Sequence, residues 1–417
     1  MRRTIVFLAG ACALFCGSAL GASKAVPRDP KIWAAAEAAR PAQLKLLEEV
    51  VDIDSGTGDV EGGRKVAAAL TPRLQAMGFS VETLPAEAPG LAENVVATLK
   101  GTGKGRILLI GHIDTVFGPG TVAKRPMRMD AERAYGPGVI DEKAGVVEAV
   151  YALQILHDVG FKGFKQIVFL LETSEERGSP GTRKLIDRLL ADADVELNLE
   201  PAGTRDELTV WRKGSATFHI EVKGRAAHAG VEPQNGRNAA AELLNQLHAA
   251  NLWPKSGDGL TVNLTLMSAG SRSNIIPEDA QAQLNVRVRD KADLDMVEAT
   301  LRKNALTTAV PDTKVTISRE PAYPPLPNNP STDALADRAE AIYAGLGMQI
   351  GRGGNGGASE SALAAEAGVP ALDGLGPMGG GAHSDVEYLE LKSLTPRLYL
   401  LTKLLISLGV DPPSRLR

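Results

Sequence analysis

Short runs of consecutive apolar residues alternate along most of the chain with longer segments whose apolar residues recur at helical spacing. Such runs are typical of strands that are buried on both faces of a mainly parallel sheet. The clearest run covers residues 107–110 and stops at Gly111, and similar runs cover residues 166–171 and 195–199. Other predicted elements of this part are two helices between residues 33 and 77, strands over 79–84 and 94–99, and a helix over 144–160. This order predicts an α/β domain.

The pattern changes from about residue 211. We predict, in order, a strand, a helix, two strands, a helix and a strand, over residues 216–222, 238–252, 260–267, 281–288, 294–304 and 314–318. This β-α-β-β-α-β order is the ferredoxin-like one. Helical and buried-strand patterns then resume over residues 333–345, 359–367, 370–375 and 394–409. The sequence therefore predicts an α+β domain, residues 212–321, inserted into an α/β domain formed by residues 23–211 and 322–417, with hinges near 202–211 and 320–330.

The first 22 residues have the pattern of a signal peptide. Arg2 and Arg3 precede an apolar stretch over residues 5–15 that is too short to span a bilayer, and small residues follow at 18–22. We expect export to the periplasm or the medium, the alternative being a retained membrane anchor. Both cysteines of the chain, Cys12 and Cys16, lie in this segment. A mature chain without thiols excludes disulfides, cysteine–zinc sites and cysteine nucleophiles.

Charge narrows the classes of partner. The 46 Lys and Arg residues against 50 Asp and Glu residues give a net charge of −4, and no long basic run is present. This balance argues against nucleic acid and, once the signal peptide is removed, against a membrane surface. A small N-acyl amino acid or a peptide is the expected kind of substrate. The 417 residues suffice for two domains with full cores.

Acidic residues and histidine follow three of the predicted buried strands. His112 and Asp114 follow the run at 107–110, Glu175 and Glu176 follow 166–171, and Glu200 follows 195–199. Ligands bind at the carboxyl edge of such a sheet, where parallel strands end together. Each signal alone has a plainer explanation, because a histidine after a strand is often a loop residue and an acidic loop is usually solvated. Their recurrence at one edge favours a metal site.

Two further candidates come from glycine-rich loops. Asp141 follows a Gly-Pro-Gly turn and precedes the predicted helix at 144–160, so it is either a helix N-cap or a ligand. His383 lies near the end of the loop at 374–390, whose apparent GxGxxG lacks the strand-to-helix context of a dinucleotide site. Together the candidate ligands are His112, Asp141, Glu176, Glu200 and His383. They suit two divalent ions that share one carboxylate, with zinc favoured and cobalt or manganese also suitable. Glu175, next to a ligand but itself left over, is the natural general base.

The segments GHIDTV, GPGVIDEKAG, ETSEERGS, NLEP, KGRAAHAG and AHSDVEY, in this order and spacing, resemble the cocatalytic zinc peptidase family of aminoacylases, dipeptidases and glutamate carboxypeptidases. The similarity covers essentially the whole mature chain and is strongest toward bacterial folate-hydrolysing glutamate carboxypeptidases. It implies that one zinc is held by His112 and Glu200, that the other is held by Glu176 and His383, and that Asp141 bridges them. It also implies that Asp114 orients His112 and that Glu175 acts as the base.

The resemblance also assigns roles to the inserted domain. It becomes a lid and dimerisation domain, so a homodimer is expected. His228 matches a lid histidine that polarises the scissile carbonyl, commonly across the dimer interface. Asn274 and Arg287 match positions that hold the substrate's terminal carboxylate, for which a guanidinium group is well suited.

The chain departs from the family pattern at a few positions. Glu142 and Ala144 stand where the family usually has Asp and Gly, and Gly357-Ala358-Ser359-Glu360 replaces a Gly-Gly-Thr-Asp-like loop. These changes put glutamate specificity in doubt without threatening catalysis. The predicted activity is metal-dependent hydrolysis of an amide or peptide bond that releases a C-terminal amino acid, with an aminoacylase or dipeptidase of other specificity as the alternative. An inert binding homologue is a further alternative, which metal content distinguishes from an enzyme.

Overall fold

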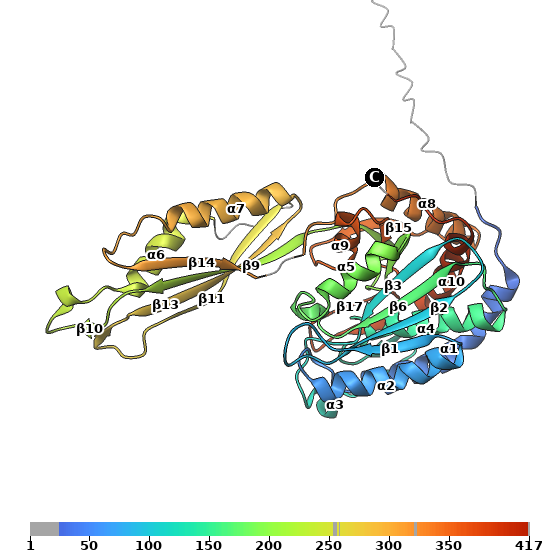
Figure 1. Ribbon diagram of the computed structural model, residues 1–417. Coiled ribbons are helices and arrows are strands. Elements are labelled where there is room, and N and C mark those ends of the chain that lie inside the picture. The colour runs from blue at the N-terminus through green and yellow to red at the C-terminus, as the bar shows by residue number, and fades with distance from the viewer. Residues whose placement is uncertain (1–24, 253–256, 258, 321–322, 416–417) are drawn as a thin grey trace, which may run out of the picture.

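The computed structural model describes residues 25–252, 257, 259–320 and 323–415. Within these residues a larger domain is built on a six-stranded sheet in the order β1-β2-β6-β3-β7-β16 (Figure 1). Strands β6, β3, β7 and β16 are parallel, whereas β2 runs antiparallel to both β1 and β6. The bounds are β1 Ser80–Leu84, β2 Asn94–Lys100, β3 Arg106–His112, β6 Gln166–Glu172, β7 Val195–Asn198 and β16 Ala371–Leu372. The sheet is therefore mixed but mainly parallel.

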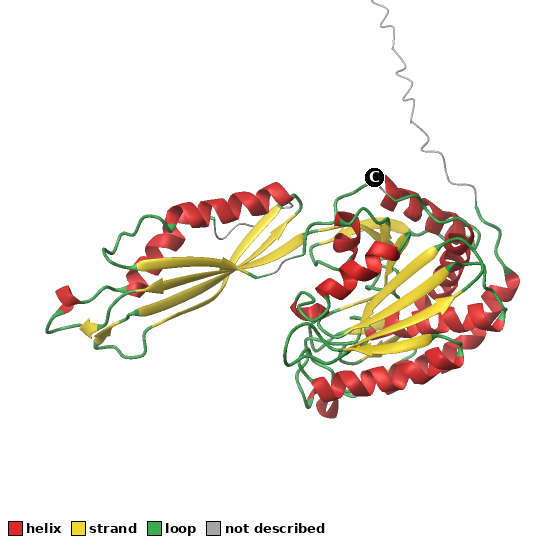
Figure 2. Cartoon of the chain, viewed as in Figure 1, coloured by secondary structure: helices red, strands yellow, loops and turns green. Residues whose placement is uncertain are grey.

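Helices cover both faces of this sheet (Figure 2). Along β3, Ile107 and Leu109 join one hydrophobic core, and Leu108 and Ile110 join the core on the opposite face. Two buried faces explain the unbroken apolar run. The first core includes residues of α1, α2, α4, α8 and α10, and the second includes residues of α5 and α9. The bounds are α1 Pro30–Val51, α2 Val60–Ala76, α4 Lys143–Asp158, α5 Arg183–Asp192, α8 Pro330–Ala344, α9 Ser361–Glu366 and α10 Leu394–Val410.

The inserted segment has a core of its own. Four of its described strands form an antiparallel sheet in the order β11-β13-β9-β14, and helices α6 and α7 pack on it. The bounds are β9 Gly214–Lys223, α6 Ala239–Ala250, β11 Leu260–Ala269, β13 Asp279–Val288, α7 Lys291–Asn304 and β14 Lys314–Arg319. Alternate residues of β9 are buried, in agreement with one face packed against helices and one face open. The predicted α/β class with a β-α-β-β-α-β segment is confirmed.

The connection between the two parts is more ordered than a hinge loop. Strand β8 (Glu207–Arg212) lies in the segment where we expected a hinge, and it pairs in parallel with β15 (Gly351–Asn355). β8 leads through Lys213 directly into β9. The returning chain pairs with it, because Arg212 and Leu326 exchange backbone hydrogen bonds of 3.0 and 3.1 Å. Backbone pairing therefore holds both chain segments that connect the two domains.

A further small sheet lies beside the main one and was not predicted. Its order is β17-β18-β5-β4, so that the chain near residue 388 pairs with the chain near residue 135. Its bounds, with those of the remaining short elements, are β4 Arg128–Met129, β5 Arg133–Tyr135, β17 Gly379–Gly380, β18 Tyr388–Glu390, α3 Thr121–Lys124, β10 Ala227–His228, β12 Ile275–Ile276, and single turns at Glu175–Arg177, Pro233–Asn235 and Leu391–Ser393.

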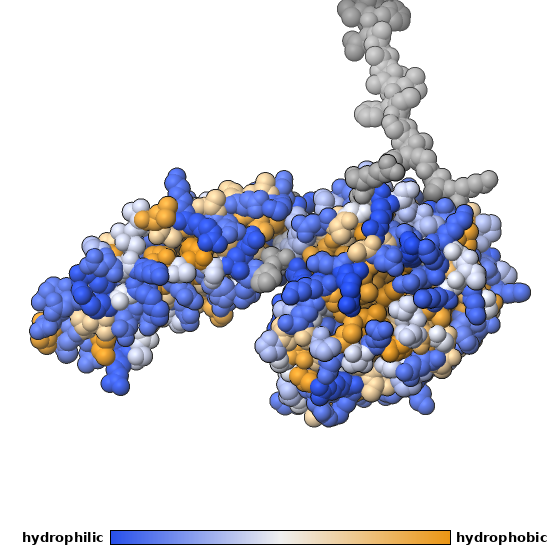
Figure 3. All heavy atoms as spheres, in the orientation of Figure 1, coloured by the Kyte–Doolittle hydropathy of each residue, from blue (hydrophilic) through white to orange (hydrophobic). Residues whose placement is uncertain are grey.

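The surface seen in Figure 3 mixes hydrophilic and hydrophobic residues on both domains. None of the helices in the described part of the chain is both long and apolar enough to cross a bilayer. The predicted signal peptide, residues 1–22, lies outside the described residues.

Candidate active site

Three neighbouring parallel strands deliver the predicted side chains to one edge of the main sheet. β3 pairs with β6 on one side and with β7 on the other. His112 is the last residue of β3, Glu175 and Glu176 begin the turn after β6, and Glu200 follows β7 by two residues. Segments separated by up to 88 residues in the sequence therefore meet at the carboxyl ends of adjacent strands.

Asp141 lies between the two histidines. Its Oδ1 is 3.2 Å from Nε2 of His112, and its Oδ2 is 3.1 Å from Nε2 of His383. Glu200 Oε1 is 3.7 Å from His112 Nε2, and Glu176 Oε2 is 3.1 Å from His383 Nε2. The five predicted ligands thus form two groups that share the Asp141 carboxylate. A helix N-cap role does not describe Asp141, because α4 begins at Lys143 and its N-cap residue is Glu142.

Burial and mutual contacts set the protonation of this cluster. Burial alone would raise the pKa of Asp141, but hydrogen bonds with His112 and His383 lower it below its usual value. Hydrogen bonds with Asp141 and Glu176 raise the pKa of His383 to about 10. Burial raises the pKa of Glu200 to about 8, opposed by the positive charge of Arg212. Several carboxylates at such close range disfavour one another's ionised forms unless cations lie among them.

The donor set fits two divalent ions. Two imidazoles and three carboxylates are the ligand types that zinc and similar metals use, and a shared carboxylate is what a pair of ions requires. Oε1 of Glu176 is buried and has no hydrogen-bond partner, which is the state expected of an oxygen that a metal would satisfy. His112, Asp141 and Glu176 also offer ligand atoms within 4.8 Å of one another.

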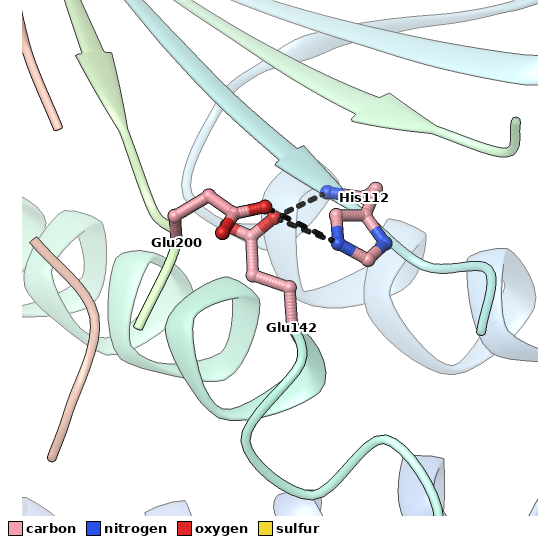
Figure 4. A group of neighbouring side chains, drawn as sticks. All are labelled: His112, Glu142 and Glu200. Atoms are coloured by element: carbon pink, nitrogen blue, oxygen red, sulfur yellow. Dashed lines mark hydrogen bonds and ion pairs between the residues drawn. The ribbon is translucent and has the colours of Figure 1, made fainter. Parts of the chain in front are cut away.

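Glu142 is a close neighbour that the sequence reasoning had treated only as a departure from the family pattern. Figure 4 shows its carboxylate close to the imidazole of His112 and the carboxylate of Glu200. Glu142 Oε2 accepts a hydrogen bond from the backbone N–H of His112 at 3.1 Å and is 3.4 Å from Nε2 of the same residue. These three residues form a second group with the spacing of metal ligands. Burial raises the pKa of Glu142 well above its usual value.

Asp114 does more than the resemblance implied. Nδ1 of His112 is closer to the backbone oxygen of Asp114, at 2.9 Å, than to its carboxylate Oδ1, at 3.6 Å. The carboxylate instead accepts hydrogen bonds from Thr57 Oγ1 at 2.6 Å and from the backbone N–H groups of Glu175 and Glu176 at 3.2 and 3.4 Å. Asp114 therefore holds the turn that carries the expected base, while its main chain orients the imidazole.

Glu175 is 9% exposed and borders the cavity next to the ligand cluster. Burial, and then the nearby carboxylate of Glu360, raise its pKa well above the usual value. A carboxyl group with a raised pKa is suited to taking up a proton and giving it back near neutral pH.

Two supporting residues were missed. Arg212 is buried and donates to Glu200 Oε2 at 3.0 Å and to both carboxylate oxygens of Asp373 at 2.7 Å. Nothing in the local sequence distinguishes it from a surface arginine on a strand. The second is Glu387, within the segment AHSDVEY, whose carboxylate accepts from the backbone N–H groups of Gly138, Ile140 and Asp141 at 2.9, 2.9 and 3.1 Å. It ties the His383 loop to the Asp141 loop.

The three predicted residues of the inserted domain separate into two places. Arg287, on β13, lines a cavity of about 300 Å³ together with Asp141, Glu175, Glu176 and Glu200. Ser215, Tyr323 and Asn355 line the same cavity and had given no signal in the sequence. His228 lies on β10, at the end of the inserted domain that points away from the larger domain (Figure 1). Asn274 is beside it, because its backbone oxygen accepts from Ala229 at 2.9 Å.

The His228 ring has a defined arrangement. Its Nδ1 lies 3.1 Å from the backbone N–H groups of Gly230 and Val231, which both donate to it. Because Nδ1 accepts these two hydrogen bonds, the proton of the neutral ring lies on Nε2, and the Nε2–H group is free to donate.

The family model described as peptidase family M20/M25/M40 matches residues 108–407. The chain belongs to this family. Carboxypeptidase G2 of Pseudomonas sp. (strain RS-16) is 34% identical over 413 residues, which cover 98% of each chain. A succinyl-diaminopimelate desuccinylase of Methylorubrum extorquens is 28% identical over 376 residues, or 84% of this chain and 94% of that one.

Solved structures agree on the fold. A tripeptidase from Staphylococcus aureus superposes with a TM-score of 0.74 at 22% identity, covering 89% of this chain and 98% of the other. An M20 family metallo-carboxypeptidase from Sulfolobus solfataricus gives a TM-score of 0.70 at 15% identity, with 87% and 98% covered. The resemblance read from the motifs is confirmed, and this M20 protein is a metal-dependent hydrolase of peptide or amide bonds.

Proposed function

We propose that the protein is a dinuclear zinc exopeptidase that releases the C-terminal amino acid from an N-acyl amino acid or a short peptide. The observation that carries this proposal is the single cavity bordered by Glu175, Arg287 and four of the five ligand candidates. A guanidinium group facing a hydrolytic site selects a substrate with a carboxylate near the scissile bond. The 34% identity to Carboxypeptidase G2 supports a carboxypeptidase activity. The resemblance of the motifs to glutamate carboxypeptidases makes glutamate a candidate for the released residue.

In the proposed reaction this chain's residues bind the substrate and move one proton. Arg287 grips the terminal carboxylate, and Glu175 takes a proton from the attacking water as the new C–O bond forms. Glu175 then returns the proton to the amine nitrogen as the C–N bond breaks. His112, Asp141, Glu176, Glu200 and His383 would hold two zinc ions, which when bound would supply Lewis-acid polarisation of the scissile carbonyl and of the water.

We further propose that the enzyme works as a homodimer in which His228 serves the partner's site. His228 and Asn274 lie together but away from the Arg287 cavity of their own chain. β11 is an edge strand of the inserted sheet, and its Leu266 and Met267 are 59% and 44% exposed. An exposed apolar edge strand is a natural pairing surface for a second copy. Export to the periplasm or the medium is proposed from the sequence of residues 1–22 alone.

Metal content and a substrate panel test the function. Inductively coupled plasma analysis of gently purified protein should give two zinc ions per chain. The panel should contain N-acyl derivatives of all common amino acids, folate-like glutamates and dipeptides, with C-terminal amides of the best substrates as matched controls. Hydrolysis of the acids but not the amides is expected. Equal rates on acids and amides would contradict the role of Arg287, and protein with two ions that cleaves nothing in the panel would refute the activity.

Mixed dimers test the position of His228. His228→Ala and Glu175→Gln chains should each be inactive, because a donor to the developing oxyanion contributes roughly 10²–10³-fold in rate and a general base roughly 10²–10⁴-fold. After subunit exchange, one site of the hybrid has an intact Glu175 and receives an intact His228, so partial activity should return. Absence of recovery, with exchange verified by differently tagged chains, would rule out a contribution in trans.

A further inference from the structure

Tyr323 joins the two domains beside the active-site cavity. It lies on the chain segment that returns from the inserted domain, and it lines the cavity that contains Arg287. Its side chain is buried and belongs to a hydrophobic core of the larger domain. Its backbone oxygen accepts a hydrogen bond at 3.0 Å from the N–H of Ser215, the second residue of β9 in the inserted domain. A single residue is therefore attached to both domains.

The backbone contact of Tyr323 leads to Arg287. In the antiparallel pairing of β9 with β13, Ser215 is the direct partner of Arg287. Residues that face each other in such a ladder are held at a fixed separation by the hydrogen bonds on either side of them. A shift of the Tyr323 backbone would therefore move Ser215, and with it the position on β13 that carries the Arg287 guanidinium group.

The hydroxyl group of Tyr323 leads to the turn that carries the expected base. It is hydrogen-bonded to Oγ of Ser179, two residues after the turn Glu175–Arg177. The backbone N–H of Ser179 donates to the oxygen of Ser174 at 2.9 Å, which closes this turn. Ser179 has a φ of 56°, in the left-handed region that is unfavourable for residues with a side chain. A buried serine in this conformation is explained if its hydroxyl group is needed there.

Glu360 completes the connection. Its Oε1 accepts hydrogen bonds from Tyr323 Oη at 3.3 Å and from Ser179 Oγ at 3.4 Å. Its Oε2 accepts from Nδ2 of Asn198 at 3.0 Å, and Oδ1 of Asn198 accepts from the backbone N–H of Glu200 at 3.2 Å. Burial, and then the charge of Glu360, raise the pKa of Tyr323 well above its usual value, so its hydroxyl group stays protonated. Buried hydrogen bonds to a carboxylate are among the strong ones, so the whole connection is stiff.

We propose that Tyr323 is a positioning residue that fixes the distance between Arg287 and Glu175, so that hydrolysis depends on the spacing between the substrate's carboxylate and its scissile bond. The inference rests on the proposed function, which places the carboxylate at Arg287 and makes Glu175 the base. Arg287 belongs to the inserted domain and Glu175 to the larger one, so their separation depends on how the domains are joined. Misplacement of reacting groups by about 1 Å can lower a rate by roughly a hundredfold.

The test compares two substrates that differ in this spacing. One is the best N-acyl α-amino acid from the panel, and the other is its β-homologue, in which one more methylene separates the nitrogen from the carboxylate. The wild type should have a kcat/KM roughly a hundredfold higher for the α-amino acid, because the methylene displaces the scissile bond by about 1 Å. Tyr323→Phe keeps the packed ring and removes the hydroxyl group. It should lower this α-to-β ratio by roughly tenfold, through a loss on the α-amino acid that the β-homologue does not share.

Two further variants complete the test. Ser179→Ala removes the other hydroxyl group and should lower the ratio to the same extent. Because both act through one hydrogen bond, the double variant should resemble either single variant. Tyr399→Phe is the matched control, since Tyr399 is also buried and its hydroxyl group accepts a hydrogen bond at 2.8 Å from the backbone N–H of Asp29, beside the start of α1. Its ratio should equal that of the wild type. Zinc content and the urea unfolding midpoint are measured for every variant.

The outcomes separate this inference from the proposed function. A wild type that binds two ions and cleaves none of the panel overturns both. A wild type that cleaves the two homologues equally well leaves the hydrolysis standing and overturns the fixed spacing. A Tyr323→Phe variant with a lower unfolding midpoint but an unchanged ratio, or an equal change of the ratio in Tyr399→Phe, reduces Tyr323 to a packing residue. If Tyr323→Phe does not fold, the ratio of Ser179→Ala decides in the same way.

Discussion

Replacing Glu387 by glutamine should weaken metal binding although Glu387 is not a ligand. The carboxylate is buried and accepts three backbone hydrogen bonds from the loop that ends at Asp141. Oε1 accepts from Ile140 and Asp141, and Oε2 accepts from Gly138. Four residues before it in the chain lies His383, whose Nε2 is 3.1 Å from Asp141 Oδ2. One side chain therefore fixes the bridging carboxylate relative to one of the two histidines.

The size of the effect follows from the hydrogen bonds. Glutamine has one acceptor oxygen, which can keep the bonds from Ile140 and Asp141, but its NH₂ group then faces the N–H of Gly138. A buried N–H left without an acceptor costs about 1–3 kcal/mol. If this free energy destabilises the arrangement of Asp141 and His383 that binds the metal, the affinity of the more weakly bound ion decreases by roughly 5- to 150-fold.

The assay is a competition titration of the metal-loaded protein with a chelator, with urea unfolding measured in parallel. Glu390→Gln is the matched control, because Glu390 lies three residues further on and pairs with Arg133 at 2.8 Å, with no ligand candidate in that pair. Its metal affinity should equal that of the wild type. A Glu387→Gln variant with a lower free energy of unfolding but unchanged affinity for both ions would refute the reasoning and reduce Glu387 to a packing residue.

Three further predictions concern other buried groups. Glu175→Gln should lower kcat by roughly 10²–10⁴-fold while both ions stay bound; loss of an ion on metal analysis would make Glu175 a ligand instead. Arg212→Met should lower the free energy of unfolding by about 3–5 kcal/mol in urea titrations, because it leaves the buried carboxylate of Asp373 without its charged partner. If this is the cause, the double variant Arg212→Met/Asp373→Asn should lose less stability than Arg212→Met alone. An unchanged unfolding midpoint of Arg212→Met would contradict the prediction. Burial lowers the pKa of Lys143 to about 7 from 10.5, so between these pH values the unfolded chain keeps a proton that the folded chain releases. As the pH rises through this range, the metal-free protein should gain up to about 1.4 kcal/mol of stability per pH unit. Lys143→Met should lack this slope, and parallel curves of stability against pH for the variant and the wild type would count against the shift.

The sequence by itself determined the parts that depend on neighbouring residues. The apolar run ending at Gly111 specified a strand with two buried faces, and its alternate residues do enter opposite cores. Because parallel strands end at one edge, the polar residues after three such runs had to meet there. The order of strands and helices over residues 216–318 likewise specified the inserted domain, since each element carries its own periodicity.

Only the tertiary structure decided how distant segments complete the site. The pairing of β5 with β18 brings the Asp141 loop to Glu387, but strands of three residues are too short to show a period. Arg212 acquires its role from Glu200 and from Asp373, which is 161 residues away. His228 and Arg287 belong to one inserted domain, yet only Arg287 reaches its own chain's cavity. Periodicity records which side of an element is buried, whereas contacts between elements depend on how the whole chain packs.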